Sequence, residues 1–194
     1  MRSVLSSVVA IVLITAVFGF AYPLVMTGFS QVAFKNQANG SLIAYRGKIV
    51  GSKLAAQSFT SPRYFHERPS ATTPAYNAAG TTFSNLGPTN PGLAKNVHAA
   101  AEAILKLDGP YNPGLTIHGI PVDAVTTSGS GIDPDISPAY ARLQAPRVAA
   151  VRRLSPATVQ RLIAQNTSGR SWGFFGEPGV NVLELNLALD RLQG

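Results

Sequence analysis

The most pronounced pattern in the sequence is an uninterrupted apolar run near the N-terminus. No charged residue occurs between Arg2 and Lys35, and the stretch Val4–Met26 is longer than the ~20 apolar residues that a helix needs to cross a bilayer. A signal peptide has a shorter apolar region, about 7–15 residues, followed by a small-residue cleavage site. The run therefore predicts a single transmembrane helix, spanning about residues 7–29, within an N-terminal anchor of residues 1–34.

Beyond the anchor, polar residues followed by proline mark where helices start. Asn90-Pro91, Ser137-Pro138 and Ser155-Pro156 each place a capping side chain before a proline. The cap accepts a hydrogen bond from a free backbone N–H, and proline suits the first turn because its missing N–H is not needed there. These starts predict helices over Pro91–Leu107, from Pro138 through a kink at Pro146 to about Arg153, and over Pro156–Gln165.

Short strand patterns alternate with these helices. Leu42–Ile49 reads as two strands joined by a turn at Arg46-Gly47-Lys48, and Pro121–Thr127 and Val180–Leu183 also have strand composition. The leucine-rich C-terminus is ambiguous by spacing, but its Leu, Ala, Glu and Asp content favours a closing helix to Leu192. Mixed strands and helices without a regular βαβ repeat predict one soluble α+β domain of residues 35–194.

The segment Thr60–Pro91 has no regular pattern and is rich in Pro, Ser, Thr, Asn and Gly. A loop of this length in a compact domain is typically functional or disordered. Its aromatic residues provide apolar area for packing, which argues against disorder. Arg68, beside Pro69, is expected to bridge several carbonyl groups or a carboxylate.

A second loop, Ser128–Gly131, leads into the Pro138 helix. A small-residue loop before a helix N-terminus can hold an anion, but this one lacks the Lys-Ser/Thr ending of a phosphate-binding loop and carries Asp133 and Asp135 at its mouth. The favoured interpretation is a tightly packed turn whose glycines allow close backbone approach and whose two aspartates help to cap the helix.

Charge and composition exclude some function classes. The net charge is +7, yet charged residues form only 13% of the chain and are scattered, which argues against nucleic-acid binding. An acidic protein surface or anionic lipid headgroups would suit this charge. The absence of cysteine excludes disulfides, thiolate metal sites and thiol catalysis. Basic residues flank the apolar run almost evenly, so charge does not decide the membrane orientation.

No catalytic or metal-binding constellation stands out. His98 and Glu102 share a helix face, but without a third ligand they are expected to form a solvated pair. No G-x-S-x-G elbow and no carboxylate pair poised for acid–base chemistry is present. We therefore expect no catalytic residues, no bound metal and no cofactor of its own in this chain.

Five groups of motifs follow one another beyond the anchor. They are Ser58-Phe59 with Arg68–Ala71, Ser84–Pro91, Ser128–Pro134 with Ile136–Pro138, Gln144 with Arg147–Ala149, and Gly176–Pro178 with Val180–Asn186. In this order, and together with the single apolar N-terminal helix, they resemble the C subunit of the bacterial Kdp potassium-transporting ATPase over nearly the whole chain.

The resemblance implies a non-catalytic accessory subunit of a high-affinity, ATP-driven potassium import complex. Its partners would be a channel-like subunit that carries potassium, a P-type ATPase subunit, a very small membrane subunit and the lipid bilayer. ATP and potassium would be ligands of the complex. The family is described as aiding assembly and stability and as a catalytic chaperone that raises the ATP affinity of the pump subunit. It is a single-pass inner-membrane protein with a periplasmic domain, so any effect on nucleotide affinity would be indirect coupling.

The motif residues supply candidates for the partner interface, expected on the Thr60–Pro91 surface and the Asp133–Arg153 region. The alternative, that these residues only brace the fold, is equally open. The rival function is a membrane-anchored periplasmic binding module that acts alone; an anchored hydrolase would need a triad or metal cluster. The interface candidates are Arg68, Asn85, Asn90, Asp133, Gln144, Arg147, Glu177 and Asn181.

Overall fold

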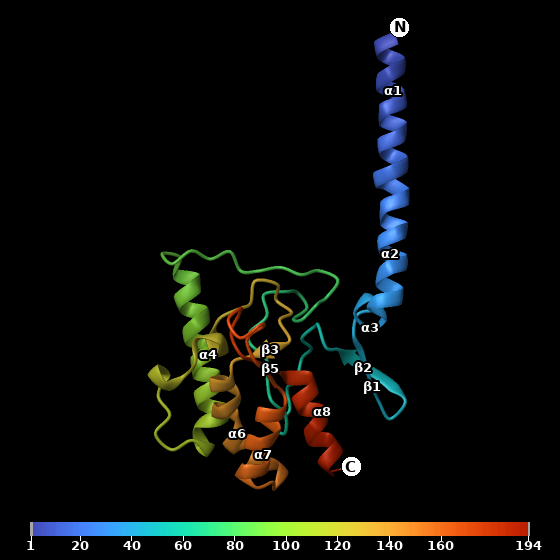
Figure 1. Ribbon diagram of the computed structural model, residues 1–194. Helices are drawn as coiled ribbons and strands as arrows, with labels where there is room; N and C mark the ends of the chain where they lie inside the picture. The colour runs from blue at the N-terminus through green and yellow to red at the C-terminus, as the bar shows by residue number, and fades with distance from the viewer. Residues whose placement is uncertain (1, 194) are drawn as a thin grey trace. The chain divides into compact units, whose positions relative to one another are not determined.

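The computed structural model describes residues 2–193, which divide into two compact units between Leu42 and Ile43 (Figure 1). In the first unit, α1 (Arg2–Ile14), a π-helical segment (Thr15–Ala21) and α2 (Tyr22–Ala33) form one continuous apolar helix. At 32 residues it is long enough to cross a bilayer, and none of its described residues is buried. The predicted N-terminal apolar helix is confirmed, while the exact ends of the span stay a prediction.

The π-helical segment follows from Pro23. Proline has no N–H to donate to the carbonyl of Gly19, and the preceding Tyr22 N–H bonds to Val17, five residues back. The irregularity therefore falls in the turn before the proline, as helix distortions usually do. A short helix, α3 (Lys35–Ala38), follows α2 and ends at Asn39, whose side chain donates to the Lys35 carbonyl at 2.6 Å.

The second unit begins with the predicted hairpin. Strands β1 (Leu42–Tyr45) and β2 (Lys48–Ser52) pair around Arg46 and Gly47, both at positive φ, as a two-residue hairpin turn requires. A second, antiparallel sheet has the order β3-β5-β4 and is formed by β3 (Asp135–Ile136), β5 (Gly179–Asn181) and β4 (Thr167–Ser168). Its register pairs Ile136 and Thr167 with Val180.

Four helices pack around this small sheet and supply most of the core. They are α4 (Pro91–Asp108), α6 (Pro138–Arg152), α7 (Pro156–Gln165) and α8 (Val182–Gln193). Helix α6 touches α4 and α7, and α7 touches α8, as the ribbon also shows. The fully buried apolar side chains include Phe65, Val148, Val159, Leu185 and Leu189, drawn from three helices and from the irregular segment. The predicted mixture of helix and sheet is confirmed.

The three predicted helix starts are confirmed by their caps. Asn90 Oδ1 accepts from Gly92 N at 2.8 Å, Ser137 Oγ from Tyr140 N at 3.0 Å, and Ser155 Oγ from Thr158 N at 3.1 Å. The closing helix is also confirmed. It begins directly after β5, because Asn181 Oδ1 accepts from Glu184 N and ends the strand two residues earlier than predicted.

Two local predictions are wrong. The predicted strand over Pro121–Thr127 is instead the one-turn helix α5 (Val122–Val125), in which the Ala124 N–H returns to the Pro121 carbonyl. The capping role expected for Asp133 and Asp135 is likewise not observed. Asp133 Oδ1 accepts from the backbone N–H of Asp135, and Asp135 Oδ1 accepts from Asn181.

Helix α6 gains its additional support from Asp123, on α5. The Asp123 carboxylate accepts from both the backbone N–H and the hydroxyl of the capping residue Ser137, at 2.8 and 2.9 Å. Sequence reasoning assigned the support to nearby aspartates, whereas a carboxylate fourteen positions away provides it.

The Ser128–Gly131 loop is a packed turn, as predicted. Gly131 has φ +73°, and its carbonyl accepts from Ser70 Oγ at 2.6 Å. A Cβ at residue 131 would lie only 2.7 Å from the Thr82 carbonyl oxygen and 2.7 Å from Thr72. The loop therefore needs glycine at this position both for conformation and for space.

We expect Gly131→Ala to lower the free energy of unfolding by about 1–3 kcal/mol, because it combines a strained backbone with a clash against main chain. Gly129→Ala, in the same loop, is the matched control, since a Cβ there meets nothing within 4 Å. Denaturant unfolding of the detergent-solubilised chain, followed by circular dichroism, measures both. Equal stability of the two variants would contradict this reading of the loop.

Candidate functional site

The structure divides the eight predicted interface residues into four groups. Gln144, Arg147 and Asn181 are buried, and Asn90 caps α4. Asn85 is exposed, with a left-handed φ of +52°. The remaining three, Arg68, Asp133 and Glu177, line one groove.

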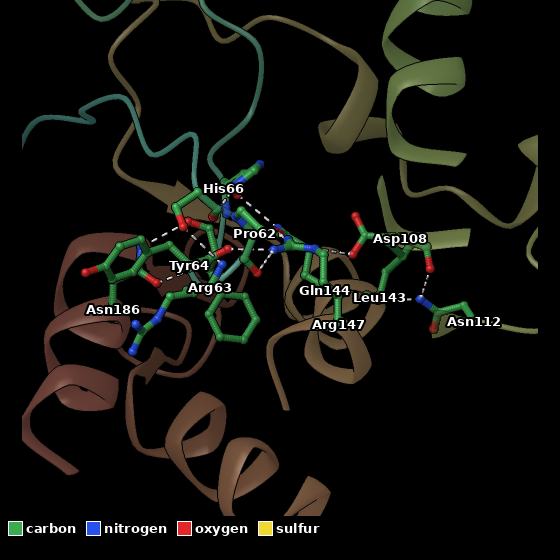
Figure 2. A network of polar contacts seen from close by, with 12 residues as sticks. Pro62, Arg63, Tyr64, His66, Asp108, Asn112, Leu143, Gln144, Arg147 and Asn186 are labelled. Atoms are coloured by element: carbon green, nitrogen blue, oxygen red, sulfur yellow. Dashed lines mark hydrogen bonds and ion pairs between the residues drawn. The ribbon is translucent and has the colours of Figure 1, made fainter. Parts of the chain in front are cut away.

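A buried network centres on Arg147 (Figure 2). Its guanidinium pairs with Asp108 of α4, Nε to Oδ1 at 2.8 Å, and both side chains are at most 1% exposed. Its Nη1 donates to the carbonyls of Pro62 and Tyr64 at 2.6 and 2.9 Å, and its Nη2 donates to Gln144 at 2.8 Å. One side chain of α6 thus joins a second helix to the irregular segment.

Two carboxamides replace strand pairing for this segment. Gln144 accepts from the His66 N–H at 2.8 Å and donates to the His66 carbonyl at 2.9 Å. Asn186 of α8 does the same for Phe65, at 2.8 and 2.9 Å. Since buried backbone groups must be paired, these amides satisfy two consecutive residues that belong to no sheet.

Arg152 completes this attachment. Its Nε donates to the Arg63 carbonyl at 2.6 Å, its Nη2 contacts Asp190 at 2.8 Å, and its guanidinium lies 4.8 Å from the centre of the Tyr64 ring. The segment 62–67, which contains neither helix nor strand among its described residues, is therefore fixed from α6 and α8. In this structure Gln144 and Arg147 offer no surface to a partner, and their contacts match the bracing role.

The groove lies between the irregular segment, α5 and the strands β3 and β5, and has a volume of about 490 Å³. Arg68 Nη1 pairs with Asp133 at 3.1 Å, and Arg68 Nη2 donates to the Thr127 carbonyl at 3.3 Å. Arg68 Nε is buried and has no acceptor among residues 2–193. The expected bridging by Arg68 is observed.

Carboxylates dominate the charge of this groove. Asp123, Asp133, Asp135 and Glu177 line it together with Arg68, which pairs with Asp133, while Arg170 pairs with Glu177 from outside the lining. Burial raises the pKa of Asp135, against the hydrogen bond from Asn181 that lowers it. The exposed rim is partly apolar, because Val122 is 73% exposed. A binding surface with this lining favours a basic side chain next to an apolar one.

A second cavity, of about 320 Å³, lies against α4 and is lined by Glu67, His66, Tyr76 and mostly apolar side chains. Glu67 is only 5% exposed, and its Oε2 has no hydrogen-bond partner in the described part of the chain. Burial raises the pKa of Glu67 to about 8, while a backbone hydrogen bond from Gln57 lowers it. Burial also lowers the pKa of the neighbouring His66 ring.

This raised pKa predicts a pH-dependent stability. The folded state holds the Glu67 proton more tightly than the unfolded chain, so its contribution is complete below pH 4.5 and is lost as pH rises to about 8. Gln at this position cannot ionise, so Glu67→Gln should remove this loss. The loss amounts to on the order of a few kcal/mol in the free energy of unfolding at pH 8. Unfolding of both proteins across this pH range measures the difference.

The exposed Glu102→Gln is the control for this pH effect and should leave the pH profile of unfolding unchanged. A Glu67→Gln protein with the same pH profile as the unmodified chain would contradict the proposed ionisation. Comparing each variant with the unmodified chain cancels the titrating groups that do not interact with Glu67. Burial and the charge of Glu67 raise the pKa of Tyr76 to about 12, which lies outside the measured pH range.

Among residues 2–193 no group of three His, Cys, Asp or Glu side chains could hold a metal ion. His98 and Glu102 form an exposed pair at 3.3 Å on one face of α4, as their spacing predicted. The described residues do form a groove lined by charged side chains and a buried hydrogen-bond network.

A family model described as K+-transporting ATPase, c chain, matches residues 4–191. The chain belongs to the KdpC family. It is 54% identical over 187 residues to the potassium-transporting ATPase KdpC subunit of Burkholderia orbicola (strain MC0-3), covering 96% of this chain and 94% of that protein. The KdpC subunits of Burkholderia vietnamiensis (strain G4 / LMG 22486) and Paraburkholderia xenovorans (strain LB400) are 53% and 49% identical, over 96% of this chain and 95% of each relative. The resemblance drawn from the motifs is confirmed.

Sequence reasoning within this KdpC chain missed the partners of the network. Asp108, Arg152 and Asp190 have charged side chains of the kind that usually lies at the surface. Only the fold reveals their roles, by burying Asp108 and Arg152 and by placing Asp190 against Arg152. Asn186 left one signal, since it is a polar residue within the leucine-rich run of α8. Glu67 and the aromatic residues Trp172–Phe175 were also not singled out.

Proposed function

We propose that this chain is a non-catalytic accessory subunit of a high-affinity, ATP-driven potassium import complex. The observation that carries the proposal is the match of the KdpC family model over residues 4–191. The relatives at about half identity are themselves named as subunits of potassium-transporting ATPases. ATP hydrolysis and potassium conduction then belong to other subunits.

The partners in this proposal are a channel-like subunit, a P-type ATPase subunit and a small membrane subunit. The chain aids assembly and stability of the complex. Any rise in the ATP affinity of the pump subunit then comes through coupling between subunits, because a periplasmic domain, as proposed below, would lie across the membrane from the nucleotide.

The groove lined by Arg68, Asp133 and Glu177 is the proposed contact with the channel-like subunit. Its walls are held in place by the Arg68–Asp133 ion pair and by the β3–β5 pairing, so little ordering is needed on binding. Its four carboxylates and the exposed Val122 suit a partner loop that carries a basic and an apolar side chain.

The proposed location is the bacterial inner membrane, with one pass and a periplasmic domain. A single cysteine can be introduced by Gly169→Cys, because the chain has no cysteine and a side chain at this exposed position meets nothing within 4 Å. A membrane-impermeant thiol reagent should label it in intact cells. Labelling only after lysis would place the domain in the cytoplasm and contradict the proposal.

Removal of the chain from potassium-limited cells tests the function. Growth at limiting potassium should fail without the chain and return when the full-length chain is supplied, whereas growth at high potassium should not change. Undiminished growth of the deletion strain at limiting potassium would contradict an accessory role in import.

A further inference from the structure

An exposed aromatic hairpin stands out from the rest of the second unit. We define the aromatic hairpin as Arg170–Glu177, which carries Trp172, Phe174 and Phe175, exposed by 87%, 62% and 57%. No charged residue lies between its two end residues. Three adjacent exposed aromatic side chains form an apolar patch of the kind that marks an interaction site.

The hairpin is held in one conformation. Ser171 and Phe175 exchange both backbone hydrogen bonds, each at 2.9 Å, and Arg170 Nη2 contacts both carboxylate oxygens of Glu177, at 2.6 and 2.8 Å. The Phe175 ring centre lies 4.2 Å from that of Phe174 and 6.3 Å from that of Trp172. The rings are therefore ordered before any contact is made, which lowers the entropy cost of binding.

The fold itself gains little from these rings. Trp172 adopts a left-handed φ of +55°, a conformation that is strained for a bulky residue, and its side chain nevertheless faces solvent. None of the three belongs to the hydrophobic core of the described residues. An ordered and exposed aromatic cluster held at a conformational cost points to a function outside the domain.

We propose that the aromatic hairpin inserts into the headgroup region of the bilayer to which the chain is anchored. Tryptophan and phenylalanine suit this region, since their rings partition into the interface and the indole N–H stays hydrated. The connecting segment limits how far the start of the second unit can lie from the end of the anchor helix, because the helix ends at Ala33 and the second unit begins at Ile43. About ten residues span at most ~35 Å, and part of them is coiled as α3.

The charge of the hairpin predicts which lipids it accepts. Arg170 and Glu177 neutralise each other at the base, so insertion depends on the apolar rings and not on anionic headgroups. Contact with zwitterionic phosphatidylcholine should therefore be as strong as with anionic vesicles. This inference rests on the membrane anchor and is independent of the role in potassium import.

Trp172 is the only tryptophan of the chain and therefore reports on its own environment. The full-length chain is incorporated into phosphatidylcholine vesicles, which are isolated by flotation. The Trp172 fluorescence is then compared between these vesicles and vesicles made of lipids whose acyl chains carry bromine near the headgroups. We expect a blue-shifted emission and a roughly twofold loss of intensity in brominated lipid, because bromine quenches only indole that lies within the interface. Phe174→Ser with Phe175→Ser should abolish most of this quenching and leave the reporter in place.

Phe83→Ser is the matched control, because Phe83 is 54% exposed and lies outside the hairpin; it should leave the quenching unchanged. Trp172 emission that is unaffected by brominated lipid would overturn the proposal. A blue shift of the Trp172 emission that arises only when the other subunits of the complex are added would also overturn it, since that result assigns the hairpin to a protein contact. Neither result would bear on growth at limiting potassium.

Discussion

Replacement of Arg147 by alanine is expected to lower the free energy of unfolding by about 3–5 kcal/mol, because it leaves the carboxylate of Asp108 buried without a counter-charge. The same change removes the hydrogen bonds that Arg147 Nη1 donates to the carbonyls of Pro62 and Tyr64. The segment 62–67 should consequently detach from α6. Denaturant unfolding of the detergent-solubilised chain, followed by circular dichroism, gives the free energy. Limited proteolysis within residues 62–67 reports the local change.

Arg142→Ala is the matched control, because Arg142 lies on the same helix but is exposed, and it should unfold like the unmodified chain. A double variant, Arg147→Met with Asp108→Leu, tests the mechanism further. Removing both charges should recover part of the lost stability, since an uncompensated buried charge costs more than an apolar pair. An Arg147→Ala protein as stable as Arg142→Ala would show that the network does not support the fold.

Val122→Asp is expected to reduce the recovery of partner subunits with the tagged chain by about tenfold, because it replaces an exposed apolar contact with a repelling charge. Val122 is 73% exposed at the rim of the groove, so the fold should tolerate the change. The new carboxylate adds to the four already in the groove and repels the basic group expected there. Affinity capture from detergent extracts, with the recovered subunits quantified, measures the effect.

Leu54→Asp is the control for this capture experiment. Leu54 is 56% exposed and does not line the groove, so the same chemical change should leave recovery near the level of the unmodified chain. Equal losses for Val122→Asp and Leu54→Asp would indicate general damage to the surface. Equal and full recovery for both would exclude the groove as the contact.

The sequence was sufficient to predict the N-terminal apolar helix and the three capped helix starts, because interactions between residues close together in the chain determine them. The apolar run could only become a long helix, and each cap followed by proline became a helix start because its hydrogen bonds lie within four residues. The prediction of a strand over Pro121–Thr127 was wrong because this segment is shaped by contacts outside itself. Among the described residues no strand pairs with it. The Ala124 N–H closes one helical turn onto the Pro121 carbonyl, and Asp123 accepts from Ser137 at the start of α6.

The candidate site depends on contacts between residues far apart in the chain. Arg68 meets Asp133 across 65 positions, and Gln144 meets His66 across 78. Motifs in the sequence marked these residues but could not separate the exposed members from the buried ones. Burial in the fold makes that separation, by placing Arg147 in the interior and Arg68 in a groove.

The most direct test of the account is affinity purification of the tagged full-length chain, in mild detergent, from potassium-limited cells. The account predicts that a P-type ATPase subunit and a multi-span channel-like subunit are recovered with it in stable proportion. Recovery of the chain alone, at undiminished yield, would contradict the accessory role. That result would favour a membrane-anchored binding module that acts by itself.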